Sequence, residues 1–367
     1  MENRKIRVAI THGDTNGIGY ELIFKAFDDP VMLELCTPII YGSPKIASYH
    51  RNILDLQTDF SIISHANEAR DGRINLLPTF DDEIKVEIGT PTEKSGNAGL
   101  KAIDRALDDY QQGFLDVLVT APINNNEAFH FSGQSRYIED HLDQSGKGLL
   151  ILVNDMLRVA LATWHLPLKQ VVESITKDTI MEKTAILHTT LRRDFRISNP
   201  RIAILALNPK AGKNGLLGIE EKEIIMPAIQ ELAENGIQAF GPYAADEFWG
   251  NGLYGDFDGI LAMYYDQGSA PFRTLTIGGG VSMTAGLPLI CMAPEHGAAF
   301  DIAGQNKADE TSFRQSIYLA LDVFRHRAEY DEPLTNPLKK LFKERRDESE
   351  KVRFTVPKKE TKDEQIS

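Results

Sequence analysis

The stretch LALNPKAGKNGLLG, residues Leu205–Gly218, indicates the fold class of the chain. It continues an uninterrupted apolar run, RIAILAL at 201–207, of the kind that forms a strand buried on both faces. The stretch turns through three glycines and enters GIEEKEIIMPAIQELA at 218–233, whose early glutamates suit a helix N-terminus. A buried strand, a glycine-rich turn and a helix in this order predict a ligand site in an α/β protein.

The same alternation of strands and helices runs along the chain. Further apolar runs predict strands at 7–12, 38–41, 60–63, 115–120, 149–153, 157–163, 257–263 and 288–292. Other segments predict helices at 44–50, 97–112, 137–142, 176–195 and 311–326. Short turns between these elements predict a mostly parallel, doubly wound α/β architecture. The segment 340–367 is dense in both charges and poor in apolar residues, so we expect a disordered tail there.

The composition excludes several classes of protein. A net charge of −13 over 367 residues argues against a nucleic acid or an anionic membrane as partner. The only cysteines are Cys36 and Cys291, which excludes a disulfide framework and a cysteine-rich zinc module. The first residues are charged, and no apolar run approaches the roughly 20 residues of a membrane span. We therefore expect a cytoplasmic protein.

Polar residues follow four of the predicted strands, at 120–124, 163–165, 208–212 and 264–268. Ligands of open α/β sheets bind outside the carboxyl ends of strands, so this repetition predicts a site built from such segments. His165 suits either a ligand-binding role or a hydrogen-bonded structural role. Asp266 suits either a cation partner or a cap of the turn at Gly268.

Two glycine-containing turns each allow two interpretations. The segment GDTNGIGYEL at 13–22 resembles a phosphate-binding loop, but its spacing matches neither the dinucleotide nor the P-loop pattern. A tight turn that needs positive φ explains it equally well. The segment PEHGAAFDIAG at 294–304 suits either contact with a nucleotide base or a turn that enters a helix.

Seven stretches of the chain occur in the order found in one known family. They are THGDTNGIGYEL, DVLVTAPIN, LRVALATWHLPL, LNPKAGKNGLLGIEE, GPYAAD, FDGILAMYYDQG and GLPLICMAPEHGAAFDIAG. From Arg7 to about His326 the chain resembles the 4-hydroxythreonine-4-phosphate dehydrogenases of pyridoxal phosphate biosynthesis. The resemblance implies two doubly wound α/β/α domains with a cleft between them, as in the isocitrate and isopropylmalate dehydrogenases. The implied domains are 1–125 with 280–335, and 126–279.

The resemblance also implies an activity. Members of this family work as homodimers, oxidise a secondary alcohol with NAD and then decarboxylate the β-keto acid, using a divalent metal. NAD is therefore the implied cofactor, and a small phosphorylated or anionic metabolite is the implied substrate. The metal lowers the pKa of the alcohol and stabilises the enolate that remains when carbon dioxide departs.

The residues at the family's metal positions differ in this chain. The resemblance maps the three metal-binding histidines onto His165, Lys210 and Tyr265. This chain reads NPKAG where the family reads NPHAG, and YYDQG where the family reads YHDQG. A protonated lysine cannot ligate a metal, and a neutral tyrosine is a poor ligand. We therefore expect the divalent metal to be lost, with His165 as the one retained ligand.

The positions that the resemblance assigns to the substrate differ as well. A His-Thr pair of the family falls on Gln134 and Ser135, and its phosphate-side Lys, Asn and Arg fall on Arg273, Ser282 and Cys291. Loss of an arginine that grips a phosphate with two hydrogen bonds removes affinity and geometry together. We expect Gln134, Ser135, Arg273 and Ser282 to bind an altered substrate.

The cofactor side differs less. The segment HGAAFDIAG is close to the family's HGTA…AG loop, which resembles the adenine-binding loop of the isopropylmalate enzymes. The resemblance assigns cofactor contacts to Asn208, His296, Gly297, Asp301 and Gly304. The acidic residues Asp246 and Asp266 are also retained.

Two hypotheses from different classes follow. In the first, the chain is a metal-independent, NAD-linked dehydrogenase in which Lys210 places an ammonium near Asp246 and Asp266. Tyr265 then transfers a proton, with a pKa lowered by that cation. In the second, the chain is a catalytically inactive paralogue that binds a nucleotide or metabolite and dimerises, and Lys210 pairs with an aspartate in an abandoned metal site.

Overall fold

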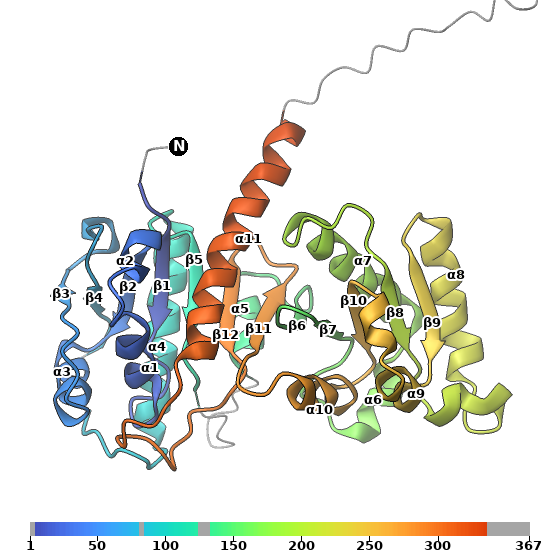
Figure 1. Cartoon of the computed structure of the whole chain (residues 1–367), viewed down its shortest axis with the longest axis horizontal. Coiled ribbons are helices and arrows are strands. Elements are labelled where there is room, and N and C mark those ends of the chain that lie inside the picture. Colours follow the sequence, from blue (N-terminus) through green and yellow to red (C-terminus); the bar gives the residue numbers. More distant parts are fainter. Residues whose placement is uncertain (1–3, 81–83, 124–132, 336–367) are drawn as a thin grey trace, which may run out of the picture.

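The computed structural model describes residues 4–80, 84–123 and 133–335, and Figure 1 shows their arrangement. Among these residues, twelve strands form one sheet in the order β3-β4-β2-β1-β5-β12-β11-β6-β7-β10-β8-β9. Alternate residues of β1 (Arg7–Thr11) enter two apolar clusters: Val8 and Ile10 enter the one that includes Leu22 of the first helix, and Ala9 enters another. Both faces of the sheet are therefore covered, and the predicted α/β class is confirmed.

The first block of the sheet is parallel and combines N-terminal strands with one late strand. Its strands are β1, β2 (Thr37–Gly42), β3 (Ser61–Ile62), β4 (Asn75–Pro78), β5 (Val117–Thr120) and β12 (Ile290–Pro294). Because β12 pairs with β5, the chain returns to this block after the second block is complete.

The second block is also parallel and carries the stretch at 201–207. Its strands are β7 (Arg158–Leu161), β8 (Ile202–Leu205), β9 (Ala239–Tyr243) and β10 (Gly259–Ala262). All four residues of β8 are buried, as the uninterrupted apolar run predicts.

Antiparallel strands join the two blocks. β11 (Val281–Ala285) pairs with β12 and with β6 (Leu149–Val153), and β6 pairs with β7. Three successive antiparallel pairings reverse the strand direction, so the two blocks run in opposite directions along the sheet. The ends of β7, β8 and β10 therefore lie side by side, whereas β5 runs in the opposite direction.

The described helices are α1 (Gly19–Ala26), α2 (Met32–Leu35), α3 (Pro44–Ile53), α4 (Glu93–Gln111), α5 (Gln134–His141), α6 (Leu168–Ser174), α7 (Lys177–Arg193), α8 (Met226–Glu234), α9 (Ala245–Gly250), α10 (Tyr265–Leu275) and α11 (Thr311–Thr335). The predicted helices correspond to α3, α4, α5, α7, α8 and α11 with shifted ends, whereas α2, α6, α9 and α10 are not predicted from the sequence. Shorter turns are η1 (Ala66–Glu68), η3 (Pro209–Gly215), η4 (Glu221–Ile225) and η5 (Leu253–Asp256). The last helix is longer than predicted and extends beyond the sheet (Figure 1).

The domain boundaries implied by the resemblance stay a prediction. One sheet runs through both implied domains, since β11 of the returning segment pairs with β6. The implied boundary at 125–126 and the charged segment 340–367 lie outside the described residues. Within the described ranges, none of the helices has the length and apolar character required to cross a bilayer.

The glycine-rich turn after β1 packs too closely against its neighbours to admit side chains. Gly13 has a φ of +72°, and a Cβ there would lie 2.4 Å from the carbonyl oxygen of Pro122. A Cβ on Gly19 would lie 1.9 Å from the carbonyl oxygen of His12. These close approaches account for both glycines by backbone geometry alone.

His12 makes the stability of this turn depend on pH. The side chain is fully buried, and its ring stacks on Tyr20 with a centroid distance of 5.1 Å. Burial, followed by the nearby His50, lowers the pKa of His12 from 6.5 to about 3. Between these pH values the unfolded chain binds more protons, so the folded state loses stability as the pH falls. Lowering the pH from 7 to 5 is expected to cost about 2 kcal/mol through His12.

Urea unfolding of the natural chain and of His12→Phe at pH 7 and pH 5 measures this contribution. Phenylalanine keeps an aromatic ring against Tyr20 and removes the titrating group. The loss of unfolding free energy between the two pH values is therefore expected to be about 2 kcal/mol smaller in the variant. An equal loss in both proteins would contradict the assignment to His12.

Candidate active site

Three of the predicted polar segments meet at one end of the second block, because β7, β10 and β8 are parallel neighbours. His165, Tyr265 and Asp266 line a cavity of about 180 Å³ there, together with Leu168 and Val171 of α6. His165 has a φ of 53°, in the left-handed region that residues with side chains rarely adopt. Backbone strain of this kind is concentrated at functional sites, so the conformation of His165 and the sequence pattern both indicate this position.

Tyr265 begins α10 and faces two other predicted site residues. Its ring centroid lies 6.0 Å from that of His165, and Arg273 Nη2 donates to its hydroxyl at 3.4 Å. Burial, followed by the charge of Glu295, raises the pKa of Tyr265 above its usual range. The expectation that Lys210 lowers this pKa is therefore wrong. Arg273 is the cation that faces the hydroxyl, and its effect is smaller than that of burial.

Lys210 lies in η3, a turn whose residues 210–214 have φ values between 44° and 70°. Its Nζ donates to Asp246 Oδ2 at 2.6 Å and to Glu247 Oε1 at 3.2 Å, both on α9. The hydrogen bond with Asp246 raises the pKa of Lys210 and lowers that of Asp246, so both groups are charged at neutral pH. More than half of each of these side chains is exposed.

The structure brings together one of the two ion pairs expected for Lys210. The pairing with Asp246 is present, whereas Lys210 and Asp266 form no ion pair within the described part of the chain. Asp266 instead lines the cavity of His165 and Tyr265. The catalytic roles of Lys210, Asp246, Tyr265 and Asp266 stay predictions.

Asn208 joins the end of β8 to the helix that follows. Its backbone N donates to Glu221 Oε1 at 2.6 Å, and its side-chain amide donates to Glu220 Oε2 at 2.7 Å and Glu221 Oε2 at 3.0 Å. Both glutamates stand at the beginning of η4, at the helix N-terminus that the sequence predicts. The amide is therefore committed to a local contact, and the cofactor role of Asn208 stays a prediction.

Gln134 and Ser135 form the beginning of α5 and tie it to the sheet. Gln134 accepts from the Thr120 hydroxyl at 2.6 Å, and the hydroxyl of Ser135 accepts from that of Thr284 at 3.0 Å. The preceding Gly133 lies beside His165, since a Cβ on it would be 3.0 Å from Cε1 of that ring. The first turn of α5 thus carries both predicted substrate residues to the side of His165.

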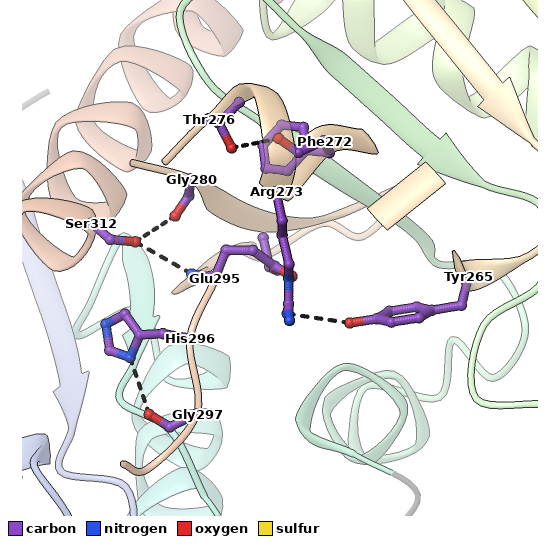
Figure 2. A network of polar contacts seen from close by, with 10 residues as sticks. Tyr265, Phe272, Arg273, Thr276, Gly280, Glu295, His296, Gly297 and Ser312 are labelled. Atoms are coloured by element: carbon purple, nitrogen blue, oxygen red, sulfur yellow. Dashed lines mark hydrogen bonds and ion pairs between the residues drawn. The ribbon is translucent and has the colours of Figure 1, made fainter. Parts of the chain in front are cut away.

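Arg273 and Ser282 meet at a residue that the sequence does not single out. Glu295, directly after β12, accepts from Arg273 Nη2 at 2.6 Å and from the Ser282 hydroxyl. Figure 2 shows the guanidinium of Arg273 between Glu295 and Tyr265. The sequence does show an acid, Glu295, next to the His296-Gly297 pair. Its partner Arg273 is 22 residues away, and their contact depends on how β11 and β12 pair.

The predicted cofactor loop borders the same network. His296, Arg273 and Glu295 line a cavity of about 250 Å³ together with the glycines at 278–280. His296 Nδ1 contacts the carbonyl of Gly297 at 3.1 Å, whereas Nε2 is buried and has no hydrogen-bond partner among the described residues. Burial lowers the pKa of His296, so its ring is neutral. Farther along the loop, Asp301 is exposed and Gly304 has a φ of +74°.

The side chains at the three metal positions do not suit a divalent ion. Lys210 carries a proton and is bound by carboxylates, and the raised pKa of Tyr265 keeps its hydroxyl protonated. The lysine ammonium has no lone pair for a metal, and a neutral phenol is a poor ligand. In the ranges that the structure describes, no three His, Cys, Asp or Glu side chains are grouped so that they could hold a metal.

The fold and this cluster define an α/β protein with a cavity where parallel strands end, the place where such folds bind ligands. The family model of the pyridoxal phosphate biosynthetic protein PdxA matches residues 34–320. The 4-hydroxythreonine-4-phosphate dehydrogenase of Bacteroides thetaiotaomicron is 53% identical over 358 residues, which cover 96% of this chain and 98% of that protein. The protein of the same name from Prosthecochloris aestuarii is 36% identical, with 86% and 96% covered.

A solved structure supports the same relationship. The crystal structure of the 4-hydroxythreonine-4-phosphate dehydrogenase from Klebsiella pneumoniae matches with a TM-score of 0.76 at 30% identity. The match covers 88% of this chain and 99% of that one. The chain belongs to the PdxA family.

Proposed function

We propose that the chain is an NAD-dependent dehydrogenase that oxidises a secondary alcohol of a small metabolite without a divalent metal. The observation that carries this proposal is the position of Tyr265, between His165 and Arg273 and beside the cavity that Asp266 lines. The relatives named above are dehydrogenases of 4-hydroxythreonine 4-phosphate by name. The changed residues at the phosphate positions support a different substrate for this chain.

NAD fits the loop that contains His296. The unpartnered Nε2 of this neutral histidine suits a hydrogen bond to the cofactor, and the cavity beside it extends to Arg273. When bound, NAD accepts the hydride that leaves the alcohol carbon. We assign His296, Gly297, Asp301 and Gly304 to its binding.

The side chains of the cluster account for the two proton transfers of the reaction. Oxidation of an alcohol also releases the hydroxyl proton, and we assign His165 as the base that receives it. Loss of carbon dioxide from the resulting β-keto acid leaves an enolate, which must take up a proton. Tyr265 is protonated and donates that proton, and the adjacent guanidinium of Arg273 stabilises the phenolate that forms. Lys210 places its ammonium at a position that the resemblance assigns to a metal ligand, where it pairs with Asp246 and Glu247.

The alternative function is that of an inactive paralogue, and one observation favours it. The Lys210 ammonium is already neutralised by Asp246 and Glu247, as expected where an ion pair fills an abandoned metal site. Such a paralogue binds a nucleotide or metabolite without turnover. In either case we propose a homodimer, as the resemblance implies.

Calorimetric titration with NADH tests the proposal. The natural chain is expected to bind NADH with a Kd below about 1 mM, in the range usual for enzyme ligands. His296→Phe keeps a ring and offers no group in place of Nε2, so it is expected to weaken binding roughly tenfold through loss of one hydrogen bond. The exposed His65→Phe is the matched control and is expected to leave it unchanged. Absence of binding at millimolar NADH would overturn the proposal.

Metal analysis and an activity assay separate the two functions. The purified protein is expected to contain no stoichiometric divalent metal, and NADH formation from alcohol substrates is expected to resist a chelator. A stoichiometric metal ion would contradict the metal-independent reaction. NADH binding without turnover of any hydroxy acid in a panel that includes 4-hydroxythreonine and its 4-phosphate would support the inactive paralogue instead.

A further inference from the structure

Glu295 is a largely buried carboxylate held by both residues expected to contact the anionic end of a substrate. Its side chain is only 9% exposed. Oε1 accepts from Arg273 Nη2 at 2.6 Å and Nε at 3.2 Å, and Oε2 accepts from the Ser282 hydroxyl. The Glu295 carboxylate therefore binds one edge of the Arg273 guanidinium and the hydroxyl of Ser282.

The backbone fixes Glu295 in this position. Its N–H donates to the carbonyl of Gly280 at 3.0 Å and to the hydroxyl of Ser312 at 3.3 Å. Ser312 in turn donates to the same carbonyl, so β12, the loop before β11 and the beginning of α11 are tied together (Figure 2). Because the carboxylate extends from this anchored residue, its contact with Arg273 does not depend on a mobile segment.

The third residue at the phosphate side adds no positive charge. Cys291 lies on β12 and is 4% exposed, and burial raises the pKa of its thiol to about 12. The thiol is therefore neutral at neutral pH. Of the three positions assigned to a phosphate, one is apolar, and the other two, Arg273 and Ser282, are bound to Glu295.

We infer that the carboxylate of Glu295 occupies the anion position formed by Arg273 and Ser282, and that the chain thereby selects a substrate without a phosphate at that end. A phosphate dianion placed there would approach a buried carboxylate and compete with it for Arg273. An uncharged hydroxyl can instead donate to Glu295 and accept from Arg273. The substrate class is therefore a hydroxy acid whose distal end is an uncharged alcohol.

Binding of inorganic phosphate tests the inference without any need for turnover. Glu295→Gln removes the competing charge and keeps the shape, and we expect it to bind phosphate at least about tenfold more tightly than the natural chain. Adding Arg273→Gln to this variant is expected to abolish the gain. Glu329→Gln, which breaks an exposed arginine pair elsewhere, is the matched control and is expected to bind phosphate as the natural chain does.

Two results would overturn the inference. One is phosphate binding by Glu295→Gln that is no tighter than binding by the natural chain, with circular dichroism showing a folded variant. The other uses Arg273→Gln by itself. If the natural chain binds phosphate saturably and this single variant does not, Arg273 is open to anions.

Selection of a substrate rests on the proposed dehydrogenase activity, whereas the occupation of the anion position by Glu295 does not. An activity assay distinguishes failure of the one from failure of the other. If the chain is a dehydrogenase, kcat/KM is expected to favour 4-hydroxy-L-threonine over its 4-phosphate, and Glu295→Gln is expected to shift this ratio toward the phosphate by roughly tenfold. If no turnover occurs, the proposed function fails. The phosphate titrations would still decide whether Glu295 fills the anion position.

Discussion

Replacement of Tyr265 by phenylalanine is expected to lower kcat of the proposed dehydrogenase about 10²- to 10⁴-fold, the usual contribution of a positioned proton donor. The change removes the hydroxyl that Arg273 contacts and leaves the aromatic ring beside His165. KM is expected to fall together with kcat, because slowing protonation of the enolate, a step after hydride transfer and loss of carbon dioxide, leaves kcat/KM nearly unchanged. Steady-state NADH formation by the two proteins measures the effect.

Rapid mixing locates the defect within the reaction. Hydride transfer precedes protonation of the enolate, so Tyr265→Phe is expected to retain a first burst of NADH while steady turnover falls. Tyr318→Phe removes a hydroxyl from the exposed side of α11 and serves as the control, with expected kcat within twofold of the natural chain. A similar kcat in Tyr265→Phe and the control would exclude Tyr265 as the proton donor.

The largest expected loss of stability comes from Arg327→Leu. Arg327 donates from Nε and Nη2 to the two oxygens of Asp194 at 2.8 and 2.9 Å, and from Nη1 to the carbonyls of Leu287 and Pro288. Asp194 is only 2% exposed, so leucine would leave an unpaired buried charge. The expected cost is about 3–5 kcal/mol in the free energy of unfolding, measured by urea denaturation.

A second ion pair on the same helix provides the control. Arg325 and Asp322 are both about half exposed and lie 3.3 Å apart, so Arg325→Leu is expected to cost less than about 1 kcal/mol. Adding Asp194→Leu to Arg327→Leu removes the unpaired charge and is expected to recover most of the loss. Equal costs for the two arginine variants would show that burial of the Arg327 pair does not govern its contribution.

The strands and helices of this protein follow from local sequence patterns. The run at 201–207 predicts the strand whose residues Ile202–Leu205 are buried, and the amphipathic segment at 97–112 predicts most of α4. Such patterns depend on residues at most a few positions apart, so they are readable before any tertiary contact is known. The left-handed backbone at His165 and the pairing of Lys210 with Glu247 carry no comparable local signal.

The sequence by itself therefore determined the α/β class, the positions of most elements and the strand ends that carry His165, Lys210 and Tyr265. The tertiary structure alone decided that these ends share an edge, because β7, β10 and β8 pair in parallel as neighbours although they are far apart along the chain. It also decided that Glu295 engages Arg273 and Ser282. That contact arises where β12 and β11 pair beside the end of α10, and the distance between those elements along the chain leaves no periodic pattern to reveal it.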